Sequence, residues 1–105
     1  MSDDTNLEVV MSLIMYGGDA RSSAFEAIQL AKKGDFEAAQ NKLKAAKQAL
    51  TQAHHSQTQM LTKEANGDKT PINLLMVHAQ DHLMTGMTFV DMATELVQIY
   101  EKYGI

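Results

Sequence analysis

Cysteine is absent from this chain of 105 residues, and proline occurs only once. Without cysteine the chain supplies no disulfide framework, iron–sulfur site or thiol nucleophile, and we expect a reducing compartment, the cytoplasm. Basic residues are also scarce, because nine lysines and arginines stand against thirteen aspartates and glutamates. The formal net charge of −4 leaves no basic stripe for phosphates, so neither nucleic acid nor an anionic membrane surface is expected as a partner.

Long apolar runs are missing as well. No window of eighteen apolar residues occurs, so no membrane-spanning helix is expected. The tract from Met1 to Asn6 is acidic and polar, whereas a secretory signal begins with a basic region. We therefore expect one unprocessed domain, 1–105, without direct membrane insertion.

The residues that are present favour helices over strands. Methionine is frequent, with eight copies, and alanine, glutamine, lysine and leucine are common. Apolar residues recur at helical spacing in three stretches, which predicts helices at about 7–33, 35–65 and 71–103. Gly17 and Gly18 interrupt the first stretch, but the pattern resumes after them and predicts one long helix, straight or bent. The predicted fold class is all-α, with three long antiparallel helices.

Glycine and capping residues mark the predicted helix ends. Gly34 suits the left-handed residue that follows a helix, and Asp35 is a favourable N-cap for the next helix. Residues 66–69, Asn-Gly-Asp-Lys, predict a turn. Thr70 and Pro71 predict the restart, because threonine caps and proline is tolerated at the first helical position.

The third predicted helix is apolar on more than one side. Three helices of this length make a thin core on their own, so a face of this breadth is expected to pack against neighbouring copies as well. The sequence therefore predicts an oligomer. The apolar residues concerned are Ile72, Leu74, Leu75, Met76, Ala79, Leu83, Met84, Met87, Val90, Met92, Leu96 and Val97.

Polar residues interrupt this apolar helix at His78, Asp81, His82 and Thr85, which share one helical face. Three interpretations are open: a polar network in which Asp81 orients a histidine, a metal site, or a histidine nucleophile that carries a group covalently. The i, i+4 spacing of His78 and His82 suits a metal ion. Metalloprotease chemistry is disfavoured, because Ala79 stands where that motif requires glutamate.

Other polar candidates carry less information. His54 and His55 belong to the second predicted helix, where we expect solvated or interface positions. Antiparallel packing would also allow them to approach the first half of the third helix. Asp19 and Arg21 are expected at the surface or as capping residues, and the methionines are expected in the core.

Three segments carry a resemblance to a known family: VHAQDHLMT at 77–85, GDARS at 18–22 and AHHSQT at 53–58. They resemble the enzyme IIA component of the lactose/cellobiose (diacetylchitobiose) class of the bacterial phosphoenolpyruvate-dependent sugar phosphotransferase system. The resemblance extends over essentially the whole chain after residue 6. It implies a cytoplasmic homotrimer whose nine helices form one bundle, which would bury the wide apolar face.

The resemblance also implies a phosphotransferase component with a phosphohistidine intermediate. By its place in the motif, His78 would accept a phosphoryl group from HPr on its tele nitrogen and pass it to a cysteine of enzyme IIB. Enzyme IIC would be an indirect partner in the uptake of a β-linked disaccharide. Asp81 would lie near the threefold axis, where Mg²⁺ or a similar divalent cation binds among three copies. The expected supporting donors or orienting groups are His82, Gln80, His54 and His55.

Two alternatives from other classes accompany this expectation. One is a non-catalytic helical oligomeric module whose His/Asp patch is structural or binds a metal. The other, metal-dependent hydrolysis, needs a third ligand and a base. The choice among lactose, cellobiose and diacetylchitobiose stays open, with overall likeness leaning towards a cellobiose-type component.

Overall fold

The structure is a computed structural model that describes residues 2–104, with side chains described for 7–104. It consists of the helices α1 (Ser2–Lys32), α2 (Phe36–Ala65) and α3 (Leu74–Tyr103). The described part of the chain has no strand, which confirms the predicted all-α class. Residues 1 and 105, the two ends of the predicted domain, lie outside the described residues.

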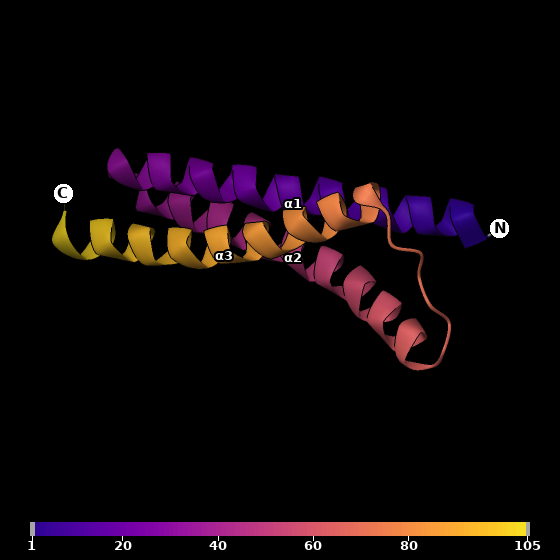
Figure 1. The fold of residues 1–105 in the computed structure, drawn as a ribbon. Coiled ribbons are helices and arrows are strands. Elements are labelled where there is room, and N and C mark those ends of the chain that lie inside the picture. The colour runs from indigo at the N-terminus through magenta and orange to yellow at the C-terminus, as the bar shows by residue number, and fades with distance from the viewer. Residues whose placement is uncertain (1, 105) are drawn as a thin grey trace.

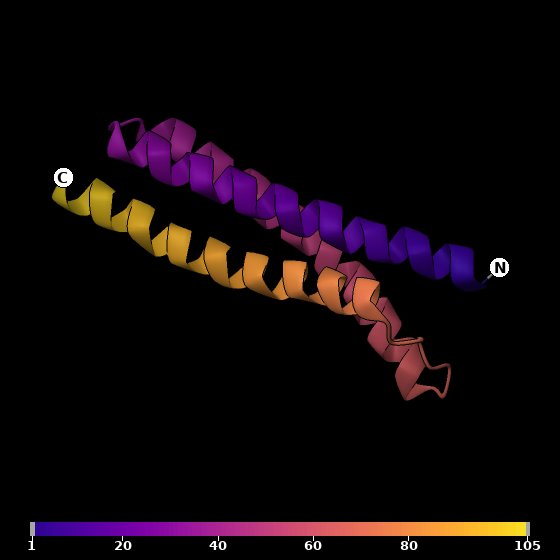
Figure 2. The ribbon, with the colours of Figure 1, turned by 45° about the horizontal axis from the view of Figure 1, so that its top comes forward.

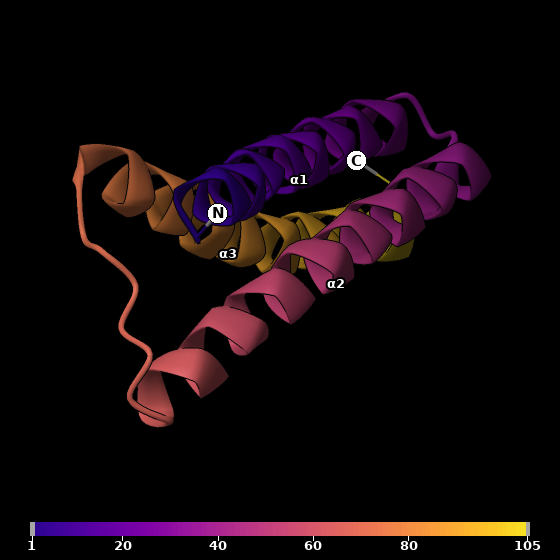
Figure 3. The same ribbon diagram turned by 90° about the vertical axis from the view of Figure 1, so that its right-hand side faces the viewer.

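The three helices form an elongated bundle measuring 52 × 20 × 19 Å. Helices α1 and α3 run in the same direction and α2 runs antiparallel to both (Figure 1). The second half of α2 and the connection that follows it swing away from the other two helices (Figure 3). None of the helices described here is long and apolar enough to cross a membrane.

The connection between α1 and α2 is built as the sequence predicted. Gly34 has a φ of +83°, and its N–H donates to the carbonyl of Ala31 at 3.0 Å while the N–H of Asp35 donates to that of Leu30 at 3.0 Å. These two bonds are the Schellman arrangement that ends many helices. The Asp35 carboxylate then accepts from the N–H of Ala38 at 3.3 Å and caps α2.

Helix α3 begins later than predicted, at Leu74 instead of Pro71. Its N-cap is Asn73, whose side-chain oxygen accepts from the N–H of Met76 at 2.8 Å. The predicted cap at Thr70 is therefore wrong. The connection has to return from the outlying end of α2 to the bundle. Extended chain spans about 3.3 Å per residue, against about 1.5 Å in a helix, so residues 71–73 give the connection more reach outside the helix than inside it.

Helix α1 is continuous through Gly17 and Gly18, as predicted, and shows no interruption in Figure 2. It starts at Ser2 instead of the predicted residue 7. The prediction relied on the apolar pattern, which begins at Leu7, whereas the backbone hydrogen bonds of a helix need no apolar side chain.

The core has two parts, separated along the bundle by a glycine contact between α1 and α3. A Cβ atom added at Gly17 would lie 2.8 Å from the carbonyl oxygen of His82, and one added at Gly86 would lie 3.1 Å from that of Gly17. Both glycines are buried, so the two backbones touch here. One part of the core contains Val10, Leu13, Ala53, Met76, Ala79 and Leu83; the other contains Ala20, Ala24, Ala27, Leu43, Ala46, Val90, Ala93 and Val97.

One side of α3 is apolar and exposed in the single chain, and we call it the outer face of α3. Leu74 is 84% exposed and Met92 is 58% exposed, although both are large apolar side chains. Asp81, also exposed, is a charged residue among them. Monomeric soluble proteins rarely expose so many large apolar side chains on one side of a helix. The apolar residues of the outer face, together with Asp81, are Leu74, Val77, Met84, Met92, Leu96, Ile99 and Tyr103. The exposed polar residues His78, Thr85, Thr88 and Glu95 lie among them on the same side of the helix.

Candidate functional site

A pair of histidines lies on successive turns of α3. The Nε2 atoms of His78 and His82 are 3.0 Å apart, and the two ring centroids are 4.4 Å apart at an interplanar angle of 78°. The rings meet because residues four apart lie on the same side of a helix. His78 is exposed and His82 is half-buried. The predicted placement of these two histidines on one helical face is confirmed, and His78 is the more exposed of the two rings.

Asp81 does not orient either histidine within the chain. Among the side chains described, no hydrogen bond joins its carboxylate to His78 or His82, and it belongs to the exposed outer face of α3. Thr85 donates to the backbone carbonyl of Asp81 at 2.7 Å, an internal bond of the helix. The interpretation as a polar network centred on Asp81 therefore does not describe the single chain.

Gln80 points towards α2 instead of towards the histidine pair. Its Oε1 accepts from Nε2 of Gln57 at 2.7 Å, and its own Nε2 lies 3.6 Å from the sulfur of Met76. The Gln57–Gln80 bond is a partly buried link between α2 and α3. Neither of these contacts joins Gln80 to His78.

His54 and His55 line a different cavity, of about 400 Å³, between α2 and α3. Met87 and Asp91 contribute its α3 side, and neither His78 nor His82 lines it. The expected approach of this part of α2 to the first half of α3 therefore takes place, because Met87 lies in that half, but the cavity is not shared with the histidine pair. Its lining residues are Leu50, Thr51, His54, His55, Thr58, Met87 and Asp91.

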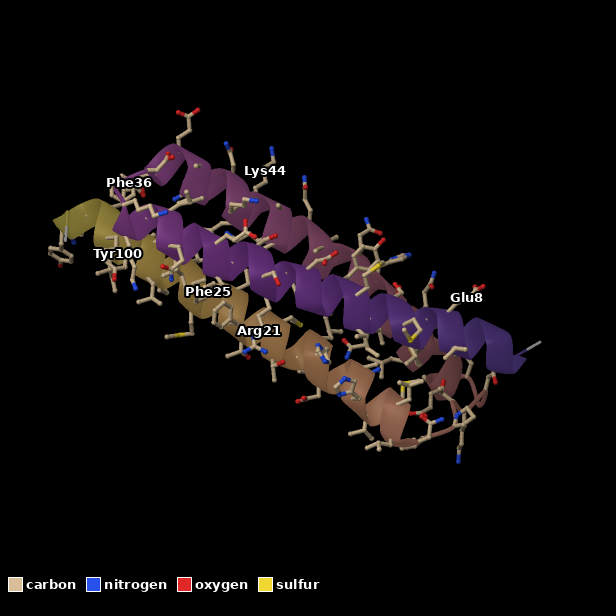
Figure 4. All side chains as sticks on the ribbon, turned by 90° about the horizontal axis from the view of Figure 1, so that it is seen from above. Glu8, Arg21, Phe25, Phe36, Lys44 and Tyr100 are labelled. Carbon is tan, nitrogen blue, oxygen red and sulfur yellow. The ribbon has the colours of Figure 1, made fainter. Side chains whose placement is uncertain are left out.

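A second cavity, of about 660 Å³, adjoins the histidine pair between α1 and α3. It is lined by His82 from α3 and by Arg21 from α1, and Figure 4 shows Arg21 near Phe25 where these helices lie together. The sequence prediction placed Arg21 at the surface, and it is exposed, but its position beside the site was missed. The available signal was that Arg21 is the only arginine in the chain. The full lining is Gly18, Arg21, Ser22, Phe25, Glu26, His82 and Phe89.

The described residues of a single chain offer no group of three or more His, Asp or Glu side chains arranged for a metal ion. The histidine pair by itself therefore supplies two ligands at most. An exposed ring nitrogen beside a second imidazole is better suited to nucleophilic chemistry, because the neighbour can fix the tautomer of the reacting ring.

Comparison with known proteins identifies the group to which the chain is similar. The family model described as "PTS system, Lactose/Cellobiose specific IIA subunit" matches residues 8–101. The lichenan-specific phosphotransferase enzyme IIA component of Bacillus subtilis is 53% identical, covering 90% of this chain and 86% of that protein.

Solved structures agree with these sequence matches. The cellobiose-specific enzyme IIA of Bacillus anthracis superposes with a TM-score of 0.88 at 43% identity, over 90% of this chain and 87% of that one. The chitobiose IIA of Escherichia coli, solved in complex with HPr, gives 0.80 at 43% identity over 93% and 95%. The chain therefore belongs to the family of lactose/cellobiose-specific IIA subunits, the phosphotransfer components of a sugar transport system.

Proposed function

We propose that the chain is a cytoplasmic phosphoryl carrier in which His78 accepts a phosphoryl group from HPr and passes it to a cysteine of enzyme IIB. The observation that carries this proposal is the exposed His78 ring, whose Nε2 lies 3.0 Å from Nε2 of His82 on a rigid helix. The likeness to a IIA protein solved with HPr supports HPr as the donor.

The histidine pair suggests how the acceptor nitrogen is prepared. Only one proton can lie between the two Nε2 atoms, so one ring donates and the other accepts. When His82 holds this proton, His78 carries its own proton on Nδ1, and the single lone pair of its Nε2 accepts the His82 N–H. That hydrogen bond has to break before the lone pair attacks phosphorus. This tautomer makes His78 the nucleophile and His82 its orienting group.

Each transfer exchanges one bond to phosphorus for another. The lone pair of His78 Nε2 forms the N–P bond while the bond from phosphorus to the donor atom breaks, and that electron pair leaves with the donor. In the onward step a thiolate of enzyme IIB forms an S–P bond, and the N–P electron pair returns to Nε2. Because phosphoryl transfer depends mainly on positioning and charge stabilisation, a site with few polar groups is sufficient.

Intact mass spectrometry tests the carrier role. The chain is incubated with phosphoenolpyruvate, enzyme I and HPr, and we expect the mass of one phosphoryl group that acid removes and base does not. The variant His78→Ala should gain nothing, whereas Lys44→Ala, changed on the exposed part of α2, should gain the group normally. Phosphorylation of HPr without transfer to the chain would favour the non-catalytic oligomeric module instead.

We further propose that the chain is a homotrimer assembled through the outer face of α3. This face is about 45 Å long at 1.5 Å per residue, and one chain leaves it exposed. Threefold closure places the same face of each copy around one axis, so three outer faces bury one another. A nine-helix bundle of this kind supplies the core volume that three helices lack.

Asp81 is the charged residue that this assembly has to accommodate. Three carboxylates brought together in an apolar interface repel one another, and Mg²⁺ or a similar hard cation with oxygen ligands relieves that repulsion. Glu95, another exposed carboxylate on this side of α3, lies about 21 Å further along the helix at 1.5 Å per residue. One chain therefore brings one carboxylate to the level of Asp81, and an ion here is shared among copies. Asp81 therefore acts in assembly, whereas His78 acts in transfer.

Two substitutions at Asp81 test the assembly. Asp81→Leu replaces like charges by apolar surface and should leave a trimer that no longer responds to a chelator. Asp81→Lys places three cations in the interface and should break it. Size-exclusion chromatography with light scattering gives the masses, and a monomeric Leu variant would refute the assignment of Asp81 to the axis.

The sugar is proposed to be a β-linked disaccharide that enters the cell through enzyme IIC, which this chain reaches only indirectly. The similar proteins are named for lichenan, cellobiose, galactose, chitobiose and lactose. We favour a cellobiose-type substrate. Deleting the gene should abolish growth on cellobiose and spare growth on glucose, and unchanged growth on cellobiose would exclude this sugar.

A further inference from the structure

Arg21 is the only arginine in the chain, and among the side chains of residues 7–104 no carboxylate forms an ion pair with it. Within residues 7–104, the ion pair present joins Lys42 to Glu26 at 2.7 Å. Glu26, the acidic residue that lines the same cavity, is already paired with Lys42 of α2. The cavity beside the histidine pair therefore carries an unneutralised guanidinium.

The guanidinium also lies over an aromatic ring of α3. Its central carbon lies 5.9 Å from the centroid of the Phe89 ring, within the range in which a cation and an aromatic face attract each other. Arg21 belongs to α1 and Phe89 to α3, so this contact crosses the helix boundary next to the cavity. A long charged side chain that would otherwise extend into solvent is thereby kept near the site.

His82 lies between the cavity that Arg21 lines and the reacting nitrogen of His78. His82 lines it together with Arg21 and Ser22, and Nε2 of His82 lies 3.0 Å from Nε2 of His78. A group bound to His78 Nε2 therefore lies beside His82, at the His82 end of this cavity. Such a group, if it is a phosphoryl group, presents oxygens that carry about two negative charges. The planar fork of arginine matches phosphate oxygens better than any other side chain does.

We propose that Arg21 is a further catalytic residue, which donates hydrogen bonds to an oxygen of the phosphoryl group on His78. The inference rests on the proposed carrier function. While the N–P bond forms and the bond to the donor breaks, the phosphoryl oxygens keep their charge, and Arg21 stabilises it without gaining or losing a proton. The side chain turns from the Phe89 ring towards the oxygens when the group arrives.

Single-turnover transfer from phosphorylated HPr tests this role in the full-length chain. Arg21→Ala should slow transfer by about 10- to 100-fold, the effect of losing one charge-assisted hydrogen bond. Arg21→Lys keeps the charge without the fork and should fall between wild type and Arg21→Ala. The matched control Lys44→Ala removes one positive charge from α2 and should stay within about twofold of wild type, because exposed distant charges are screened.

A second measurement separates contact with the phosphoryl group from a purely structural role. In a ³¹P NMR titration of the phosphorylated chain, the phosphoryl pKa should be higher in Arg21→Ala than in wild type, because a nearby cation favours the dianion. An unchanged rate or an unchanged phosphoryl pKa would overturn the proposal. A change in oligomeric mass with an unchanged phosphoryl pKa would instead assign Arg21 to a contact between copies. Failure of wild type itself to accept the group would overturn the carrier function and this inference together.

Discussion

Replacing Gly17 by alanine should destabilise the fold, whereas the same change at neighbouring Gly18 should stabilise it. A Cβ at Gly17 would lie 2.8 Å from the carbonyl oxygen of His82, and ordinary contact begins at 3.4 Å, so α1 would have to move by about 0.6 Å. The clash is with backbone, which cannot rotate away as a side chain would. At Gly18 nothing lies within 4 Å of the added atom.

The two effects can be given magnitudes. Overpacking of this kind costs about 1–3 kcal/mol, and alanine gains about 1 kcal/mol over glycine inside a helix. Gly17→Ala should therefore lose up to about 2 kcal/mol of unfolding free energy, while Gly18→Ala should gain about 0.5–1 kcal/mol. The predicted gap between the two variants is about 1–3 kcal/mol, which corresponds to roughly 4–20 °C in Tm for a chain of this size.

Urea and thermal unfolding, followed by circular dichroism at equal protein concentration, measure this gap. Equal concentration matters because assembly changes the apparent stability. The adjacent position is the control, since both variants add the same atom to the same helix. Equal stability of the two variants, or a more stable Gly17→Ala, would refute the close backbone contact between α1 and α3.

Other substitutions give smaller, independent checks by the same unfolding assay. Leu83→Ala empties a fully buried position and should cost about 2–5 kcal/mol, and a loss below 1 kcal/mol would contradict its place in the core. Asn73→Ala removes the 2.8 Å cap of α3 and should cost about 1 kcal/mol, with Asn73→Asp as the tolerated control. Lys42→Ala breaks an ion pair whose side chains are 45% and 55% exposed, and a change greater than about 1 kcal/mol would show that this surface pair is unusually strong.

Local signals predicted the parts of the fold that depend on neighbours in sequence. Gly34 and Asp35 end one helix and begin the next through bonds that span a few residues, so their roles could be predicted from residue type. The start of α3 could not, because it depends on how far α2 swings from the bundle. Asn73 is as good a cap as Thr70, and only the path of the connection selects between them.

The residues of the candidate site likewise differ in whether local sequence or tertiary packing determines their positions. The contact of His78 with His82 follows from their spacing on one helix and was predicted. The position of Arg21 beside His82 depends on the packing of α1 against α3 at Gly17, a tertiary contact that no helical pattern reveals. For the same reason His54 could not be placed, since its neighbours are decided by the divergence of α2.

The single hydrogen bond between His78 and His82 matters for a protein that has to accept a group from one partner and release it to another. In the proposed carrier, the N–H of His82 that points at His78 Nε2 in the empty state points at a phosphoryl oxygen in the loaded state, so one hydrogen bond replaces another. His82 then keeps an acceptor for its N–H in both states, and the direction of transfer follows from which partner carries the phosphoryl group. A deeper binding site would take the group readily and release it slowly, which would block the flow of phosphate towards the sugar.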